Sequence, residues 1–234
     1  MTEIYLIRHG QASFGQPAYD CLSPVGERQA ELLGRHFANN GIRFDCIYSG
    51  ALKRHLQTAT IALGQMNGYD AKDIRIDDGF NEFGDSDKLM NRLTAVIEEN
   101  PDLSEQLAQI HTNHGAIRRI FDIAAKVDAI PRDEEVHLQR VKEFRDRIDS
   151  AIDNLVQHVG ENKKVAVFTS GGPTAVALRK TLDTSREQTI RLGWEVRNTS
   201  VTVLRYDQEQ LWLVLFNCVA HLESQNDPSL ITYI

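Results

Sequence analysis

The stretch VAVFTSGGPTAVALRK, residues 165–180, joins a predicted strand to a predicted helix through a pair of glycines. The apolar run before the glycines is typical of a strand buried on both faces of a sheet. A strand that turns at glycines into a helix points backbone N–H groups at any anion bound there. Ser170 lies at this turn, so the sequence predicts an anion site around it.

Three interpretations of the Ser170 hydroxyl follow from its neighbours alone. A hydrolase nucleophile is disfavoured, because position 168 is Phe where the GxSxG elbow needs glycine. A helix N-cap is consistent with the position, since serine is a preferred capping residue. A phosphate ligand is also consistent, because a hydroxyl at a helix N-terminus can donate to a phosphoryl oxygen.

Strand-like runs recur along the rest of the chain, and several are continuously apolar rather than alternating. This pattern favours a largely parallel sheet covered by helices on both faces. The predicted strands are residues 3–8, 44–50, 163–170, 200–207 and 210–217.

Two helices are predicted from their end signals and apolar faces. One begins after Ser23 as the N-cap, has Pro24 in its first turn and ends before Gly41. The other covers residues 134–159 and stops at Gly160, and its apolar residues recur every three or four positions. These residues are Phe144, Ile148, Ile152, Leu155 and Val159.

The alternation of strands and helices predicts one α/β domain over residues 1–234, a three-layer sandwich with a mostly parallel central sheet. The polar, helix-prone stretch at 86–133 has no strand pattern and is predicted to be a helical insertion. Such an insertion would cover the strand ends, where α/β sheets bind ligands, or else form a packed layer with no role at the site.

The composition is that of an ordinary globular protein, with 41% hydrophobic residues, 25% charged residues and a formal net charge of −7. The negative charge argues against a nucleic-acid or membrane surface. The three cysteines form no CxxC pair, and no apolar run approaches the ~20 residues of a membrane span. The N-terminus predicts a core strand rather than a signal peptide, so we expect a cytoplasmic protein. We also expect neither a metal nor a cofactor.

Charged residues follow the predicted strands where an α/β sheet presents its functional groups. Arg8 and His9 end the first strand, and Arg54 lies near the start of the helix after the second. An arginine beside a helix N-terminus is a natural anion site. A third group lies in IRIDDGFNEFGD, whose carboxyl groups suit either a metal cluster or a general acid. They belong to Asp77, Asp78, Glu82 and Asp85.

Taken in order, these segments resemble the histidine phosphatase superfamily, the phosphoglycerate mutase-like proteins. The segments that carry the resemblance are LIRHGQAS (6–13), LSPVGERQA (22–30), IYSGALKRHLQTA (47–59), FNEFG (80–84), EFRDRIDSAIDNL (143–155) and NTSVTVLRYD (198–207).

The resemblance implies a metal-independent phosphatase whose nucleophile is His9, which becomes a phosphohistidine. Arg8 and Arg54 would bind the phosphoryl oxygens, and Glu82 would be the general acid. Gln11 in LIRHGQAS, with Ser170 and Gly171 in TSGG, would complete the set of phosphate-binding residues.

One position departs from the family pattern. Family members usually carry a second phosphoryl-binding histidine where this chain has Ser170. Losing one preorganised donor typically costs on the order of 10²–10³ in rate. If serine stands in for that histidine, Ser170→His is predicted to raise or preserve activity. His114 in NHGAI and His221 in FNCVAHL are weaker candidates for the missing group, and a structural role is the more ordinary one for both.

Two functions remain open from the sequence. The first is a phosphomonoester hydrolase, with a phosphorylated small molecule or a phosphoprotein as its substrate. The second is a catalytically weakened relative that binds a phosphorylated ligand as a regulator. A phosphatase is favoured over a glycolytic mutase, because FNEFGDSDKLMNRL lacks the glutamate-rich, tyrosine-containing segment of those mutases and no Trp-Asn follows RHG. Retention of Glu82 favours the enzyme, and Ser170 favours the regulator. The oligomeric state is left open.

Overall fold

The computed structural model describes residues 1–13, 20–84, 115 and 134–233. Within these residues, six strands form one sheet in the order β3-β2-β4-β1-β5-β6. The strands are β1 (Thr2–Arg8), β2 (Cys46–Ser49), β3 (Ile74–Ile76), β4 (Lys164–Thr169), β5 (Val201–Tyr206) and β6 (Leu211–Cys218). The first four neighbours in that order pair in parallel, and β5 runs antiparallel to both β1 and β6. The predicted α/β class with a mostly parallel sheet is confirmed.

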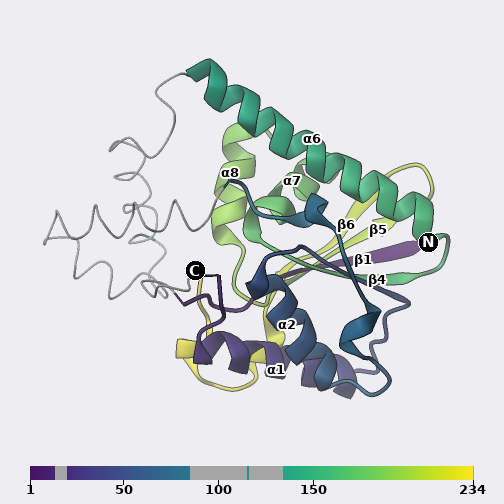
Figure 1. The fold of residues 1–234 in the computed structure, drawn as a ribbon, viewed down its shortest axis with the longest axis vertical. Helices are drawn as coiled ribbons and strands as arrows, with labels where there is room; N and C mark the ends of the chain where they lie inside the picture. Colours follow the sequence, from purple (N-terminus) through teal and green to yellow (C-terminus); the bar gives the residue numbers. More distant parts are fainter. Residues whose placement is uncertain (14–19, 85–114, 116–133, 234) are drawn as a thin grey trace, which may run out of the picture.

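Helices cover both faces of the sheet (Figure 1). They are α1 (Pro24–Asn39), α2 (Lys53–Gly64), α6 (Glu134–Val159), α7 (Gly171–Leu182), α8 (Arg186–Glu195) and the short α9 (Ala220–Glu223). In Figure 1, α1 and α2 lie below the sheet, and α6, α7 and α8 lie above it. The layers follow from alternation along β4, since Val165 and Val167 pack with α6 and α7, whereas Ala166 and Phe168 pack with α1 and α2.

The two predicted helices begin and end where their sequence signals place them. Ser23 is the N-cap of α1, and its hydroxyl accepts a hydrogen bond from the Gly26 N–H at 3.1 Å. Gly41 follows the helix with a φ of 63°, in the left-handed region that favours glycine. On α6, the predicted apolar face is buried in the core between that helix and the sheet.

The five predicted strands are confirmed, and each predicted end lies within about two residues of the observed end. The three-residue β3 and the helix α8 were not predicted as elements. The insertion expected at 86–133 lies outside the described residues, apart from Gly115. In the part of the chain that the structure describes, no helix has both the length and the apolar character needed to cross a bilayer.

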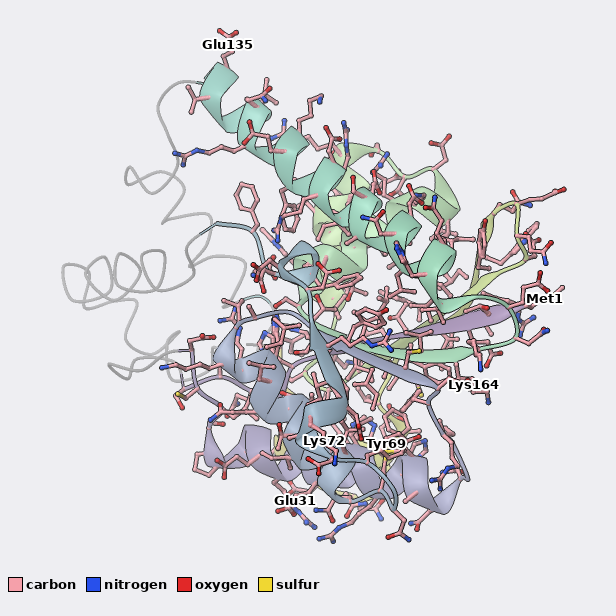
Figure 2. All side chains as sticks on the ribbon, turned by 45° about the vertical axis from the view of Figure 1, so that its right-hand side comes forward. Met1, Glu31, Tyr69, Lys72, Glu135 and Lys164 are labelled. Carbon is pink, nitrogen blue, oxygen red and sulfur yellow. The ribbon has the colours of Figure 1, made fainter. Side chains whose placement is uncertain are left out.

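The parallel strands bring the predicted site to one edge of the sheet. Figure 2 shows Met1 and Lys164 near each other, at the edge where β1 and β4 begin. Because β1 and β4 pair in parallel with Arg8 opposite Thr169, both strands end at the far edge. The pairing continues one residue further, where the His9 N–H donates to the Thr169 carbonyl at 2.9 Å. His9 and Ser170 therefore leave neighbouring strands side by side.

Candidate active site

His9 is buried directly after β1, with 4% of its surface exposed. Its Nδ1 lies 2.7 Å from the carbonyl oxygen of Gly10. A carbonyl oxygen only accepts, so Nδ1 carries the proton and Nε2 keeps its lone pair. Burial, and then the positive charges of Arg54 and Arg8, hold the pKa of His9 well below its usual range. The ring is therefore a neutral imidazole whose Nε2 carries no proton.

Arg54, on the first turn of α2, contacts that nitrogen. Its Nε donates to His9 Nε2 at 3.2 Å, and its Nη1 forms an ion pair of 2.7 Å with Asp20 Oδ1. The other carboxylate oxygen of Asp20 accepts the Lys53 N–H at 2.9 Å. Asp20 therefore fixes both the helix start and the guanidinium group. Sequence reasoning missed Asp20, since no motif distinguishes it.

Arg8, the last residue of β1, is half-buried beside His9. Its Nη1 donates to the carbonyl of Val196, which follows α8. The strand end thus carries two guanidinium groups, those of Arg8 and Arg54, close enough to lower the pKa of His9. Two such forked donors around one imidazole suit an anionic ligand.

Glu82 reaches the same region from the loop after the 3₁₀ turn Asp78–Phe80. Its Oε2 accepts the Gly172 N–H at 3.1 Å, and its Oε1 accepts the Phe83 N–H at 2.7 Å. A carboxylate at a helix N-terminus is favoured by the helix dipole. Arg147 on α6 holds the loop by donating to the carbonyls of Asn81 and Glu82. Glu82, the predicted general acid, therefore contacts the N-terminus of α7 at Gly172, which is two residues after Ser170.

Gln11 and Gly171 have structural contacts of their own. The Gln11 N–H donates to Gln29 at 2.8 Å, and Gln11 Oε1 accepts the Ser23 hydroxyl at 2.6 Å. A Cβ added to Gly171 would lie 2.8 Å from the Gly193 carbonyl oxygen, so glycine lets α8 approach α7 closely. Phosphate binding by Gln11 and Gly171 stays a prediction.

Ser170 occupies the N-cap position of α7, but its hydroxyl does not cap the helix. The hydroxyl instead lies 2.6 Å from Nε2 of His55. Both side chains are fully buried, and the ring of His55 stacks near that of His9, with 5.5 Å between centroids. Ser170 is therefore at the N-cap position that the sequence allowed, but its hydroxyl makes no capping hydrogen bond.

Sequence reasoning missed His55, although it directly follows Arg54 in KRHLQTA. Of the two alternative histidines, His114 lies outside the described residues. His221 contacts Thr199 Oγ1 at 2.9 Å and lies 6.0 Å from the ring of His36. Burial lowers the pKa of His221 to about 3. His221 is therefore a buried structural histidine, and His55 is the imidazole beside Ser170.

The acidic residues near Glu82 have local roles at the turn. Asp77 accepts the Gly79 N–H at 2.8 Å, and Asp78 accepts the Asn81 side-chain amide at 3.1 Å. Asp85 lies outside the described residues. Among the residues that are described, no group of three or more histidine, cysteine or acidic side chains could hold a metal ion.

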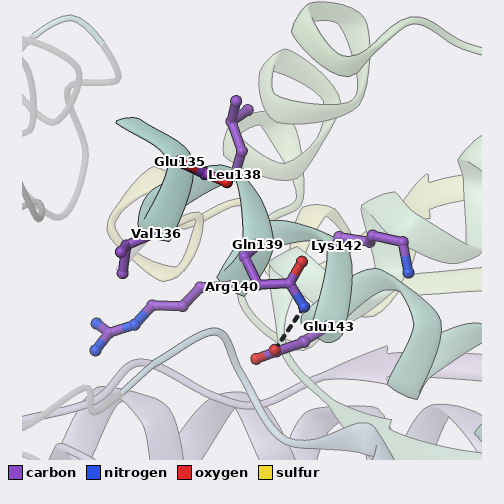
Figure 3. Close-up of a pocket in the computed structure, with 7 residues that line it drawn as sticks. All are labelled: Glu135, Val136, Leu138, Gln139, Arg140, Lys142 and Glu143. Carbon is purple, nitrogen blue, oxygen red and sulfur yellow. Dashed lines mark hydrogen bonds between the residues drawn. The ribbon is translucent and has the colours of Figure 1, made fainter. Parts of the chain in front are cut away.

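A separate hollow runs along the first turns of α6 (Figure 3). Residues between Glu135 and Glu143 line it, and a hydrogen bond of 2.8 Å joins Gln139 to Glu143. Within the described part of the chain, none of the site residues above lines this hollow.

The fold and the site together define an α/β protein that gathers an imidazole, guanidinium groups and a carboxylate at the carboxyl ends of its strands. The model of the histidine phosphatase superfamily (branch 1) matches residues 4–219. The chain belongs to this superfamily.

Curated relatives match a shorter part of the chain. The mitochondrial serine/threonine-protein phosphatase Pgam5 of Caenorhabditis elegans is 42% identical over 60 residues, which cover 26% of this chain and 21% of that protein. The 2,3-bisphosphoglycerate-dependent phosphoglycerate mutase of Thermobifida fusca is 38% identical over 69 residues, which cover 27% and 28% of the two chains. The alignments thus span less than a third of these curated relatives.

Solved structures match nearly the whole chain. YhfR of Bacillus stearothermophilus has a TM-score of 0.62 at 20% identity, covering 95% of this chain and all of that one. A phosphoserine phosphatase mutant of Entamoeba histolytica in complex with phosphoserine has a TM-score of 0.61 at 20% identity, with the same coverage. The phosphoglycerate mutase of Bacillus anthracis has a TM-score of 0.59 at 18% identity and covers 97% of both chains. At these identities the likeness establishes the fold.

Proposed function

We propose that this protein is a phosphomonoester hydrolase that acts through a phosphohistidine on His9. The state of the His9 ring is the observation that carries the proposal. A nucleophilic histidine needs an unprotonated nitrogen aimed at phosphorus. The hydrogen bond from Nδ1 to Gly10 and the lowered pKa leave Nε2 without a proton. Its lone pair accepts the Arg54 Nε–H, so Arg54 marks where an anion would lie.

The first half-reaction transfers the phosphoryl group to the enzyme. His9 Nε2 attacks phosphorus and the bond from phosphorus to the ester oxygen breaks. Glu82 enters this step in its protonated form and donates that proton to the departing alcohol. Arg8 and Arg54 neutralise the charge on the phosphoryl oxygens. The Arg54 Nε–H, which now donates to His9, turns to a phosphoryl oxygen.

The second half-reaction frees the histidine. Water attacks phosphorus, the bond from phosphorus to His9 Nε2 breaks, and the Glu82 carboxylate takes a proton from the attacking water. Inorganic phosphate then leaves. All the groups for both steps come from the chain, so the proposed hydrolase works without metal or cofactor.

The substrate is a phosphorylated small molecule or a phosphoprotein, and the proposed location of the enzyme is the cytoplasm. The family, together with neighbours that include a phosphoserine phosphatase and a phosphoglycerate mutase, supports this class of ligand. Serine at position 170 favours the second candidate, a weakened relative that binds a phosphorylated ligand without turning it over. The retained nucleophile and acid favour the enzyme.

The test compares wild type, His9→Ala and His158→Ala on an aryl phosphate, with acid-labile phosphate labelling in parallel. His158 is an exposed histidine on α6 and serves as the matched control. We expect turnover and label in wild type and His158→Ala, and neither in His9→Ala. Wild type without turnover or label would leave the ligand-binding candidate, and unchanged activity in His9→Ala would refute the phosphohistidine mechanism.

A further inference from the structure

The strongest unexplained contact of the site is the one between His55 and Ser170. Their Nε2 and Oγ atoms are 2.6 Å apart, and both side chains are fully buried. The two residues come from different elements, α2 and the turn after β4. Ser170 stands where the family usually has a histidine, and His55 places an imidazole against its hydroxyl.

The position of the proton on the His55 ring decides which of the two side chains donates the hydrogen bond. Burial and the charge of Arg54 hold the pKa of His55 well below its usual range, so the ring is neutral and carries one proton. Nδ1 has no hydrogen-bond partner among the described residues. It faces Gly50, on which an added Cβ would lie only 2.4 Å away. A proton on Nδ1 would therefore be a buried donor without an acceptor, whereas a proton on Nε2 leaves Nδ1 as a buried acceptor without a donor. Of the two, the buried N–H without a partner is the rarer in proteins.

This favours a proton on Nε2, from which His55 donates to Ser170 Oγ. The Ser170 hydroxyl then has its own hydrogen to donate. In the described part of the chain, the contact with His55 is the one hydrogen bond that this hydroxyl makes. Because Ser170 leaves β4 beside His9, and the rings of His9 and His55 are 5.5 Å apart, the phosphoryl group on His9 is the natural acceptor.

We propose that His55 and Ser170 act as one unit, in which His55 Nε2–H donates to Ser170 Oγ and the Ser170 hydroxyl donates to a phosphoryl oxygen held at His9. Ser170 contacts the phosphoryl group, and His55 is a positioning residue behind it. The pair does the work of the second histidine that the family usually carries at position 170. The inference rests on the proposed function, because it assumes a phosphoryl group at His9.

The pair also changes the expectation for Ser170→His. Ser170 is fully buried, with its hydroxyl 2.6 Å from the His55 ring. A second imidazole at position 170 would need space that His55 already fills. Ser170→His alone is therefore expected to lower activity, contrary to the sequence-based prediction. Combining it with His55→Ala, which vacates that space, should restore part of the loss.

The experiment uses substitutions that separate the hydrogen bond from the bulk of the side chain. Ser170→Ala removes the donor to phosphate, and His55→Leu removes the donor to serine. His55→Gln keeps an amide N–H near the position of Nε2, and His55→Asn carries the same amide too short to reach. The readouts are kcat/KM on an aryl phosphate, affinity for inorganic phosphate by calorimetry, and thermal unfolding as a check on the fold.

We expect Ser170→Ala, His55→Leu and His55→Asn each to lower kcat/KM on the order of 10²–10³-fold, the cost of one preorganised donor. Combining Ser170→Ala with His55→Leu should cost no more than either change alone, and His55→Gln should recover most of the activity. If His55→Leu does not fold, the comparison of His55→Gln with His55→Asn decides whether the hydrogen bond to Ser170 is needed for activity.

Failure of this inference is distinct from failure of the proposed function. If wild type shows turnover and label on His9 while Ser170→Ala keeps full activity, the hydrolase stands and the unit is refuted. Equal losses in His55→Gln and His55→Asn would also refute it. If wild type shows no turnover, the proposed hydrolase fails, and the affinity for inorganic phosphate then tests the unit of His55 and Ser170. Weaker phosphate binding in Ser170→Ala and His55→Asn, but not in His55→Gln, supports the unit. Any other order of affinities refutes it.

Discussion

Gly172→Ala should separate Glu82, the proposed general acid, from the rest of the site. Gly172 lies in the first turn of α7, and its N–H donates to Glu82. An added Cβ would lie 2.2 Å from Glu82 Oε1 and 3.2 Å from Phe144 Cζ. These neighbours are the ends of side chains, so the backbone can stay in place while Glu82 moves away.

The size of the effect follows from that distance. Ordinary contact with a Cβ begins at 3.4 Å, so the carboxylate must retreat by more than about 1 Å. A misplacement of about 1 Å at a reacting group can cost ~10²-fold in rate. The lost hydrogen bond to a half-buried carboxylate costs about 1.5 kcal/mol, at the low end for a charged partner. The gain of about 0.5–1 kcal/mol from alanine over glycine in a helix offsets part of that loss. We therefore expect a large drop in activity with little change in stability.

The assay compares two aryl phosphates with leaving groups of different basicity, alongside urea unfolding. A basic leaving group depends more on protonation, so phenyl phosphate should lose more rate than p-nitrophenyl phosphate. The matched control is Gly64→Ala at the end of α2, where an added Cβ meets nothing within 4 Å. Equal losses on both substrates would show that Glu82 is not the acid, and full activity on both would show that its position does not matter.

Three further perturbations test other parts of the structure. Asp20→Asn removes the ion pair that holds Arg54, and kcat/KM should fall by about tenfold, or ~1.4 kcal/mol, with an unchanged melting temperature. Burial holds the pKa of His221 to about 3, below its unfolded value of ~6.5, so this group destabilises the fold as pH falls from 6.5 towards 3. In His221→Asn, the decline of unfolding free energy between pH 6.5 and 4 should be shallower by about 1.4 kcal/mol per pH unit, and equal slopes would contradict this. Gly26→Ala places a Cβ 2.1 Å from the backbone oxygen of Gln11, and urea unfolding should show a loss of more than ~2 kcal/mol.

The main elements of the fold could be predicted because each carries its own local signal. Continuous apolar runs mark the strands in the interior of the sheet, and Ser23 and Gly41 mark the ends of α1. β3 gave no comparable signal, because it has three residues and two of them are exposed. α8 begins with a capping box at Ser185 that was not recognised in the sequence.

The site was predictable where a residue follows a strand directly. His9 follows β1, Arg54 is in the first turn after β2, and both lie at the predicted edge of the sheet. Asp20 and His55 could not be placed in this way, since tertiary packing decides what they contact. Asp20 forms an ion pair with Arg54, which is distant in the sequence, and His55 on α2 contacts Ser170 in the turn after β4.

The family motif treats each position separately, so a serine at position 170 counts as the loss of a phosphoryl-binding group. The contact between positions 55 and 170 brings in an imidazole that this motif does not include. The buried space beside His9 is shared by side chains from α2 and from the turn after β4, and it is already filled by the imidazole of His55. An imidazole at one of these positions therefore excludes a second at the other. The consequence of Ser170 for activity can be judged only together with the residue at position 55, because the two side chains divide one space and one hydrogen bond.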